Sequence, residues 1–217
     1  MRNLALVWVL AGVAVALLAA GDGRKPPVST FTDKRDRKVY KIVRIGSQVW
    51  FAENLNYDTI GSVCYDNKAE NCAKYGRLYD WNTAMKACPV GTHLPTDKEW
   101  TTLASYIYGE KKTVNNLKSS TGWYRNGTDD YGFSALPSGH GKVGGKCFDC
   151  DTSKVRFCNV GNVAFWWSAT EYNDDDAVYG AIEDSEFEYN YVYRDYVRKT
   201  SWFSVRCVLD DEKERRK

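Results

Sequence analysis

The sequence predicts a single α+β domain with two helices packed on antiparallel sheets, long ordered loops and disulfide bridges. Three observations predict it. Apolar residues recur with helical spacing in the middle of the chain, strand-like segments occur on both sides of them, and seven cysteines follow an apolar N-terminal segment. The 217 residues are enough to bury a sizeable core, and 14% of them are aromatic, which indicates a folded chain.

The N-terminus is typical of a secretory signal peptide. A single charge, Arg2, precedes an apolar run over residues 4–20 that ends in small residues. We therefore expect export to the periplasm, the cell surface or the extracellular space. An uncleaved membrane anchor is the alternative, because the run is nearly long enough to span a bilayer. The expected organisation is a signal peptide over 1–21, a linker over 22–32, a domain over 33–209 and a charged tail over 210–217.

The folded part is predicted to begin with a hairpin. The segment "KVYKIVRIGSQVWF" alternates like a strand up to Ile45, turns at Gly46 and Ser47, and returns through Phe51. The turn-rich segment that follows is predicted to hold a small polar loop between Cys64 and Cys72.

Two helices are predicted next, and "CPVGTHLPTDKEW" joins them. In the first helix, Asp80 is the N-cap, Pro89 ends the helix, and the buried stripe is Trp81, Ala84, Met85 and Cys88. Thr96 and Glu99 have the spacing of a capping box for the second helix. Its apolar face is Trp100, Leu103, Ala104 and Ile107, and Gly109 can close it. These roles favour a structural joint over a reactive site, with His93 as a hydrogen-bonded residue of that joint.

The second half of the chain is predicted to be a long packed loop followed by strands. Residues 113–162 are rich in Gly, Asn, Ser and Asp, and their aromatic side chains need burial: Trp123, Tyr124, Tyr131 and Phe133. Strands are expected within 162–172, 177–183, 187–193 and 201–209. The formal net charge is only +2, and the one basic cluster, "EKERRK", is of mixed sign, so a nucleic-acid partner is not expected.

Five ordered motifs identify a resemblance that covers about residues 33–208. "YKIVRIGSQVWFAENLNY", "CAKYGRLYDWNTAM", "CPVGTHLPTDKEW", "FWWSATEY" and "FSVRCV" together resemble the Fibrobacter succinogenes major paralogous domain, a family of exported bacterial proteins. The family name describes an abundance of paralogues and carries no biochemistry. The chain departs from the pattern at Arg37, where the family usually has a glycine, which weakens the case for a tight turn there. The cluster "CFDCDTSKVRFC" is a second departure.

A wider resemblance is to the C-type-lectin-like fold, whose order of helices and cysteines is followed by "WNTAMKAC", "TDKEWTTL" and "FSVRC". The resemblance implies a bridge between Cys88 and Cys207. The next expected bridge is Cys64 with Cys72, since only a polar loop separates them. Cys147, Cys150 and Cys158 then compete for one bridge and leave one cysteine over. Cys147 and Cys150 also have the spacing of half a zinc site or of a redox pair, although a local disulfide is favoured in an exported chain with two histidines.

The calcium-dependent sugar site of C-type lectins does not carry over, because its Glu-Pro-Asn or Gln-Pro-Asp and Trp-Asn-Asp triplets are absent from the sequence. The loop "TEYNDDD" offers other oxygen ligands for a hard cation such as Ca²⁺, namely Glu171, Asn173, Asp174 and Asp176 with Asp175 between them. The alternative is a solvated loop tip. No other cofactor is expected.

Enzyme motifs are missing from the sequence: it has no Gly-x-Ser-x-Gly, His-Glu-x-x-His or phosphate loop. A glycosidase with paired carboxylates would leave no motif and stays open. The formylglycine-generating enzymes share the lectin-like core, but they need two active cysteines near the C-terminus, where this chain has only Cys207.

An aromatic stripe carries the ligand prediction. Phe187, Tyr189, Tyr191 and Tyr193 alternate along one strand, and such a face is either a platform for sugar rings or the core of a sheet. The predicted function is non-catalytic recognition at the bacterial surface, with extracellular polysaccharide as the leading ligand class. The alternatives are a structural or protein-binding module without a sugar site and, more weakly, a formylglycine-generating-type enzyme.

Overall fold

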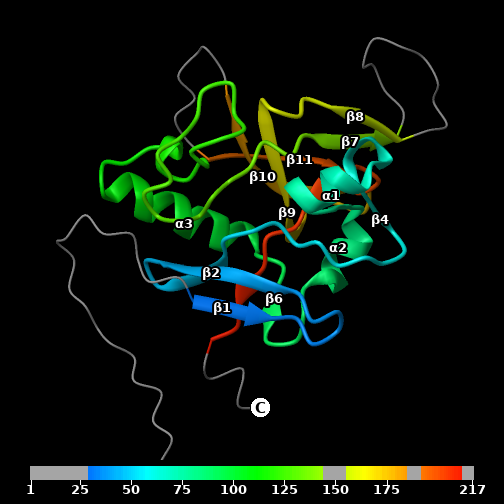
Figure 1. Cartoon of the computed structure of the whole chain (residues 1–217), viewed down its shortest axis with the longest axis horizontal. Helices are drawn as coiled ribbons and strands as arrows, with labels where there is room; N and C mark the ends of the chain where they lie inside the picture. The colour runs from blue at the N-terminus through cyan, green and yellow to red at the C-terminus, as the bar shows by residue number, and fades with distance from the viewer. Residues whose placement is uncertain (1–28, 144–154, 185–191, 212–217) are drawn as a thin grey trace, which may run out of the picture.

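The computed structural model describes residues 29–143, 155–184 and 192–211. Within these residues the fold is α+β (Figure 1). Its helices are α1 (Ala69–Tyr75), α2 (Trp81–Ala87) and α3 (Asp97–Gly109), with single 3₁₀ turns at Tyr65–Asn67 and Val114–Asn116. Its strands are β1 (Ser29–Thr32), β2 (Val39–Ile45), β3 (Gln48–Phe51), β4 (Ser62–Val63), β5 (Leu78–Tyr79), β6 (Thr92–His93), β7 (His140–Val143), β8 (Val155–Cys158), β9 (Val163–Glu171), β10 (Asp176–Glu183), β11 (Tyr193–Arg198), β12 (Phe203–Ser204) and β13 (Val208–Leu209).

The strands form three sheets. One has the order β1-β2-β3-β13-β6 and the second β11-β10-β9-β12-β5-β4, while β7 and β8 make a separate hairpin. All pairs are antiparallel except β12 with β9. The last segment of the chain therefore contributes one strand to each large sheet and ties them together. None of the described helices is long and apolar enough to cross a membrane.

The predicted hairpin and both predicted helices are present. Ile45 pairs with Gln48 across a turn in which Gly46 has a φ of 60°, a backbone conformation that glycine adopts without strain. The Asp80 carboxylate caps α2 by accepting from the Thr83 N–H, and Thr96 and Glu99 form the capping box of α3. Local rules of capping were therefore sufficient to place these elements.

One predicted core position in α2 was wrong. Met85 is 43% exposed, whereas Ala87 is buried with Trp81 and Ala84. The helix ends at Ala87, so its buried face follows residues three apart instead of including the fourth position. In α3 the four predicted apolar residues are all buried.

Two elements were missed in the N-terminal part. The predicted linker contains β1, which pairs with β2, and Phe31 in it lies 5.4 Å from the Phe51 ring. The predicted polar loop between Cys64 and Cys72 contains the start of a third helix, α1. The turn before β2 forms although Arg37 has a φ of 62°, because its N–H donates to the Asp33 carbonyl at 2.7 Å.

The long loop was partly misread. Trp123 and Phe133 are buried and Tyr131 is half-buried, but Tyr124 is 81% exposed. The stretch also contains the β7–β8 hairpin, which has no clear alternation in the sequence. Packing of the two buried rings under the loop explains why it is ordered without regular structure.

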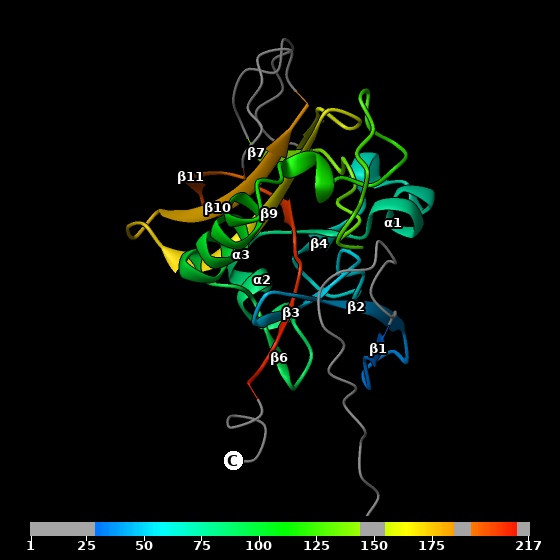
Figure 2. The same ribbon diagram turned by 90° about the vertical axis from the view of Figure 1, so that its left-hand side faces the viewer.

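The core is divided into two clusters that a buried cation joins. One lies under α3 around Trp50, Trp100 and Trp166, and the other lies around Trp81, Trp167 and Phe203. Figure 2 shows α3 lying against β9 and β10. Side chains from all three elements belong to the first cluster.

The cation is Arg206, which is fully buried. Its Nε and Nη2 donate to the Asn54 Oδ1 at 3.1 and 2.7 Å, and its guanidinium lies 4.4 Å from the Phe133 ring centroid. Asn54 in turn accepts from the Trp166 indole N–H at 2.8 Å. Since a buried charge is tolerated only when its donors are satisfied, this network fixes how β3, β9 and the last segment meet.

Candidate functional site

Two of the predicted disulfides are present. Cys88 is bonded to Cys207 over a sequence separation of 119 residues, and Cys64 is bonded to Cys72. Cys158 is disulfide-bonded as well, while Cys147 and Cys150 lie outside the described residues. The Cys88–Cys207 bridge joins the end of α2 to the segment just before β13.

The joint between α2 and α3 places His93 between two carboxylates. Its Nδ1 lies 2.6 Å from the Asp210 Oδ1, and its Nε2 lies 2.7 Å from the Glu99 Oε1. The hydrogen bond to Glu99, together with the one to Asp210, raises the pKa of His93 to about 9, although burial lowers it. Burial raises the pKa of Glu99, but its hydrogen bonds from His93 and Thr96 outweigh burial and leave the pKa below its usual value.

This arrangement makes His93 a poor general base. At neutral pH the imidazole is protonated, so it has no lone pair to accept a proton. Both of its N–H groups are already donated to carboxylates. The prediction that His93 is a hydrogen-bonded residue of the joint is in agreement with this geometry.

A groove of about 940 Å³ opens beside His93. This volume lies within the range of ligand-binding pockets. Its walls come from the β2–β3 hairpin, the first turns of α3, and β13 with the residues after it. They are Arg44, Ser47, Gln48, Val49, His93, Thr96, Lys98, Glu99, Thr102, Val208, Leu209, Asp210 and Asp211. The groove was missed from the sequence because these segments are distant along the chain.

The predicted metal ligands come together in the loop between β9 and β10, but they are engaged with other groups. Glu171 accepts from the Lys199 Nζ at 2.8 Å, and the Asn173 side-chain oxygen accepts the Asp176 N–H at 2.8 Å. Arg198 lies 3.7 Å from the Asp176 carboxylate.

Two further acids complete this loop. The neighbouring Asp175 carboxylate accepts from Arg198 at 2.7 Å, and the backbone carbonyl of Asp174 accepts from the Lys199 Nζ at 2.8 Å. Across the described ranges, no group of three or more His, Cys, Asp or Glu residues is placed to hold a metal ion. A calcium ion at the loop would have to compete with Lys199 and Arg198.

Only one residue of the predicted aromatic stripe lies in the described part of the chain. Tyr193 begins β11, is half-buried against the second core cluster, and donates its hydroxyl to Asp195 at 2.6 Å. Phe187, Tyr189 and Tyr191 lie outside the described residues, so their role in ligand binding stays a prediction. Tyr193 itself faces the core side of the sheet.

An exposed aromatic pair lies on the opposite face of β11. The rings of Tyr172 and Tyr196 are parallel, with centroids 3.7 Å apart and planes 3° apart, and the residues are 55% and 46% exposed. The sequence held a signal for one of them, since alternation in "YRDYVR" places Tyr196 opposite in direction to Tyr193. Its partner could not be found, because Tyr172 lies 24 residues earlier.

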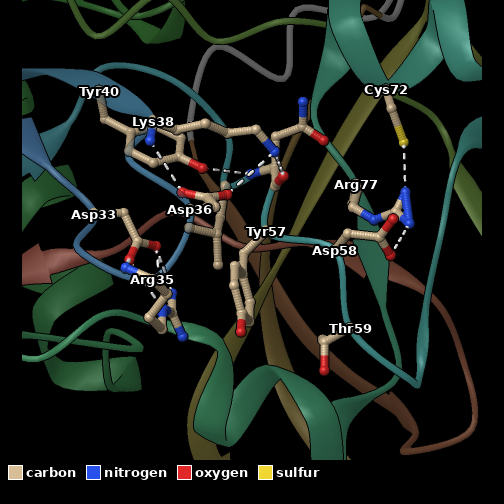
Figure 3. Close-up of polar contacts among 12 residues, drawn as sticks. Asp33, Arg35, Asp36, Lys38, Tyr40, Tyr57, Asp58, Thr59, Cys72 and Arg77 are labelled. Carbon is tan, nitrogen blue, oxygen red and sulfur yellow. Dashed lines mark hydrogen bonds and ion pairs between the residues drawn. The ribbon is translucent and has the colours of Figure 1, made fainter.

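A third polar region lies at the other end of β2 (Figure 3). Its arginine side chains contact neighbouring groups of the protein. The Arg35 Nη2 donates to Asp33 at 2.7 Å, and its guanidinium lies 3.8 Å from the Tyr57 ring centroid. Arg77 binds Asp58, and its Nη1 lies 3.3 Å from the Cys72 sulfur. These contacts fasten the β1–β2 turn and α1 to the loop before β4.

A cavity next to this network, of about 220 Å³, is smaller than a ligand pocket usually is. Its charged lining residues each have another contact: Lys38 lies 3.3 Å from Asp36, Glu53 accepts from the Lys41 N–H at 2.7 Å, and Lys74 lies 4.7 Å from the Tyr75 ring centroid. We therefore assign this region a structural role.

Comparison with known proteins identifies the family of the chain. The family model of the Fibrobacter succinogenes major domain matches residues 43–209. No curated protein and no solved structure matches the chain. The match covers most of the chain, from within β2 through β13, and includes the tyrosine pair and the groove residues other than Asp210 and Asp211. The chain therefore belongs to the Fibrobacter succinogenes major domain family.

Proposed function

We propose that the protein is an exported, non-catalytic recognition module of C-type-lectin-like fold that binds polysaccharide at the bacterial surface. The observation that carries the proposal is the exposed, coplanar pair of Tyr172 and Tyr196. Aromatic rings present a large, rigid apolar face with a polar hydroxyl at the edge, which suits the apolar face and the hydroxyl rim of a sugar ring.

The tyrosine pair is held in place before any ligand arrives. Parallel rings without offset are not the preferred geometry of an aromatic pair, so other contacts must contribute to holding them. Lys199 binds Glu171 beside Tyr172, and Arg198 binds Asp175 across the same loop. These ion pairs link the loop to β11. A surface fixed in this way loses little conformational entropy on binding.

Two observations support a non-catalytic role. His93 is protonated at neutral pH and both of its N–H groups are engaged. Cys207 is bonded to Cys88, so it is not available as one of the two free cysteines that formylglycine-type chemistry needs.

The same bridge supports the lectin-like fold, because the resemblance to that fold implies a bond between Cys88 and Cys207. Disulfides also favour an oxidising, exported compartment.

The test is a binding assay with matched tyrosine variants. Affinity electrophoresis of the purified protein through gels containing xylan, mixed-linkage β-glucan or polygalacturonate measures retardation by each polymer. We expect Tyr172→Ala and Tyr196→Ala each to weaken retention about tenfold, which corresponds to about 1.4 kcal/mol. Tyr124→Ala is the control, because Tyr124 is 81% exposed and lies outside this site.

Two results would contradict the proposal. One is equal retention of the wild type and of both site variants. The other is no retention by any polymer, which would favour the alternative of a structural or protein-binding module without a sugar site.

A further inference from the structure

We infer that the binding surface extends from the tyrosine pair across the first turn of α3 into the groove beside His93, and that it selects acidic polysaccharide chains. The inference rests on the proposed function and adds the class of ligand. It is carried by the continuity of the two regions and by two cations of the groove that have no acidic partner among the described residues.

The first turn of α3 lies directly against the strands that carry the tyrosines. The Ala169 N–H donates to the Pro95 carbonyl at 2.8 Å, and the Thr170 hydroxyl accepts from the Asp97 N–H at 3.0 Å. Tyr172 directly follows β9, two residues after Thr170, and its ring stacks on that of Tyr196. The tyrosine pair is therefore adjacent to the N-terminus of α3.

An ion pair makes the same connection from β11. The Arg194 Nη2 donates to the Asp97 Oδ2 at 2.8 Å. Arg194 and Tyr196 share one face of the strand, about 7 Å apart along it. Asp97 is followed by Lys98, which lines the groove. Arg194 and Asp97 thus connect the surface around Tyr196 to Lys98.

Charge in the groove is unevenly neutralised. Glu99 and Asp210 share the single His93 imidazolium at 2.7 and 2.6 Å, so these three groups are paired with one another and together keep one net negative charge. Arg44 on β2 and Lys98 on α3 also line the groove, and neither has an ion pair within the described ranges. Unpaired cations facing a groove attract carboxylate or sulfate groups, and an arginine can bind a carboxylate through two parallel hydrogen bonds.

Besides that paired group, the opposing charge is Asp211, an exposed acid that also lines the groove. Ser47 and Thr102 add hydroxyl groups that can pair with those of a sugar. An acidic polymer stacked on the tyrosines would therefore place its carboxylates near Arg44 and Lys98. Loss of the negative charge at Asp211 should strengthen its binding.

The experiment compares polygalacturonate with the same polymer after chemical reduction of its carboxylates to alcohols. We expect the wild type to bind the acidic form at least about tenfold more tightly at low salt, with the difference shrinking as salt screens the charges. The double variant Arg44→Glu/Lys98→Glu should lose this difference while still binding the reduced polymer. Asp211→Asn should increase affinity for the acidic form.

The control is Lys34→Glu/Lys86→Glu, which changes net charge equally at two exposed lysines outside the groove. Near-ultraviolet circular dichroism checks that each variant is folded. Equal loss in the control and the groove variant would overturn the inference, since net charge alone would then explain binding. So would unchanged preference for the acidic polymer in Arg44→Glu/Lys98→Glu. In both cases a loss of binding in the tyrosine variants would leave the proposed function intact.

Discussion

The position of His93 between Glu99 and Asp210 predicts that the protein loses stability as the solution becomes alkaline. The pKa of His93 is raised from 6.5 to about 9 in the folded protein. The folded state therefore holds the proton more tightly than the unfolded state does. The stabilisation is fully present below pH 6.5, falls as the pH rises, and is lost above about pH 9.

The magnitude follows from the displaced pKa and the exposure of the ring. Each tenfold change in proton affinity is worth about 1.4 kcal/mol, so a displacement from 6.5 to about 9 sets an upper limit of about 3.4 kcal/mol. The His93 side chain is 35% exposed, and solvent screens its charge. We therefore expect a loss of about 1 to 2 kcal/mol in the free energy of unfolding between pH 6.5 and 9.5.

The assay is urea unfolding followed by tryptophan fluorescence at several pH values, for the wild type and for His93→Gln. The variant has no charge at this position, so the stability advantage of the wild type should shrink as the pH rises and become constant at high pH. Taking their difference removes contributions from titrating groups that do not contact His93, including the buried Lys118. An unchanged pH dependence in His93→Gln, or a wild type that gains stability relative to the variant as the pH rises, would refute the reasoning.

Three further changes should act on stability, and urea unfolding measures each. Arg206→Met removes the guanidinium donors to the Asn54 Oδ1 and to the Phe51 and Phe133 carbonyls and should cost about 3 kcal/mol; a loss below about 1 kcal/mol would contradict the role of the network. Replacement of Cys88 and Cys207 by alanine removes a bridge across 119 residues and should cost about 4 to 5 kcal/mol in the chain-entropy model, so an unchanged midpoint would speak against it. Thr96→Ala removes the N-cap of α3 and should cost about 1 kcal/mol, whereas Thr102→Ala, an exposed change on the same helix, should cost clearly less.

The sequence by itself determined the elements whose cause is local. The turn at Gly46, the Asp80 cap and the capping box at Thr96 each depend on residues within about four positions, so spacing alone predicted them. The motifs also determined the family. α1 escaped because a seven-residue helix is too short to show apolar periodicity, and packing of Cys72 and Tyr75 is what holds it. β1 was missed because it is a short edge strand, held among the described strands by β2 alone.

The tertiary structure decided the candidate site. Tyr172 meets Tyr196 only because β10 pairs with β9 on one side and with β11 on the other. Arg44, Lys98 and Asp211 line one groove only because β3 pairs with β13 beside the first turn of α3. Which side chains become neighbours depends on strand order and on the packing of two core clusters around Arg206. These are long-range properties, because they come from burying surfaces that belong to distant segments, and no spacing in the sequence encodes them.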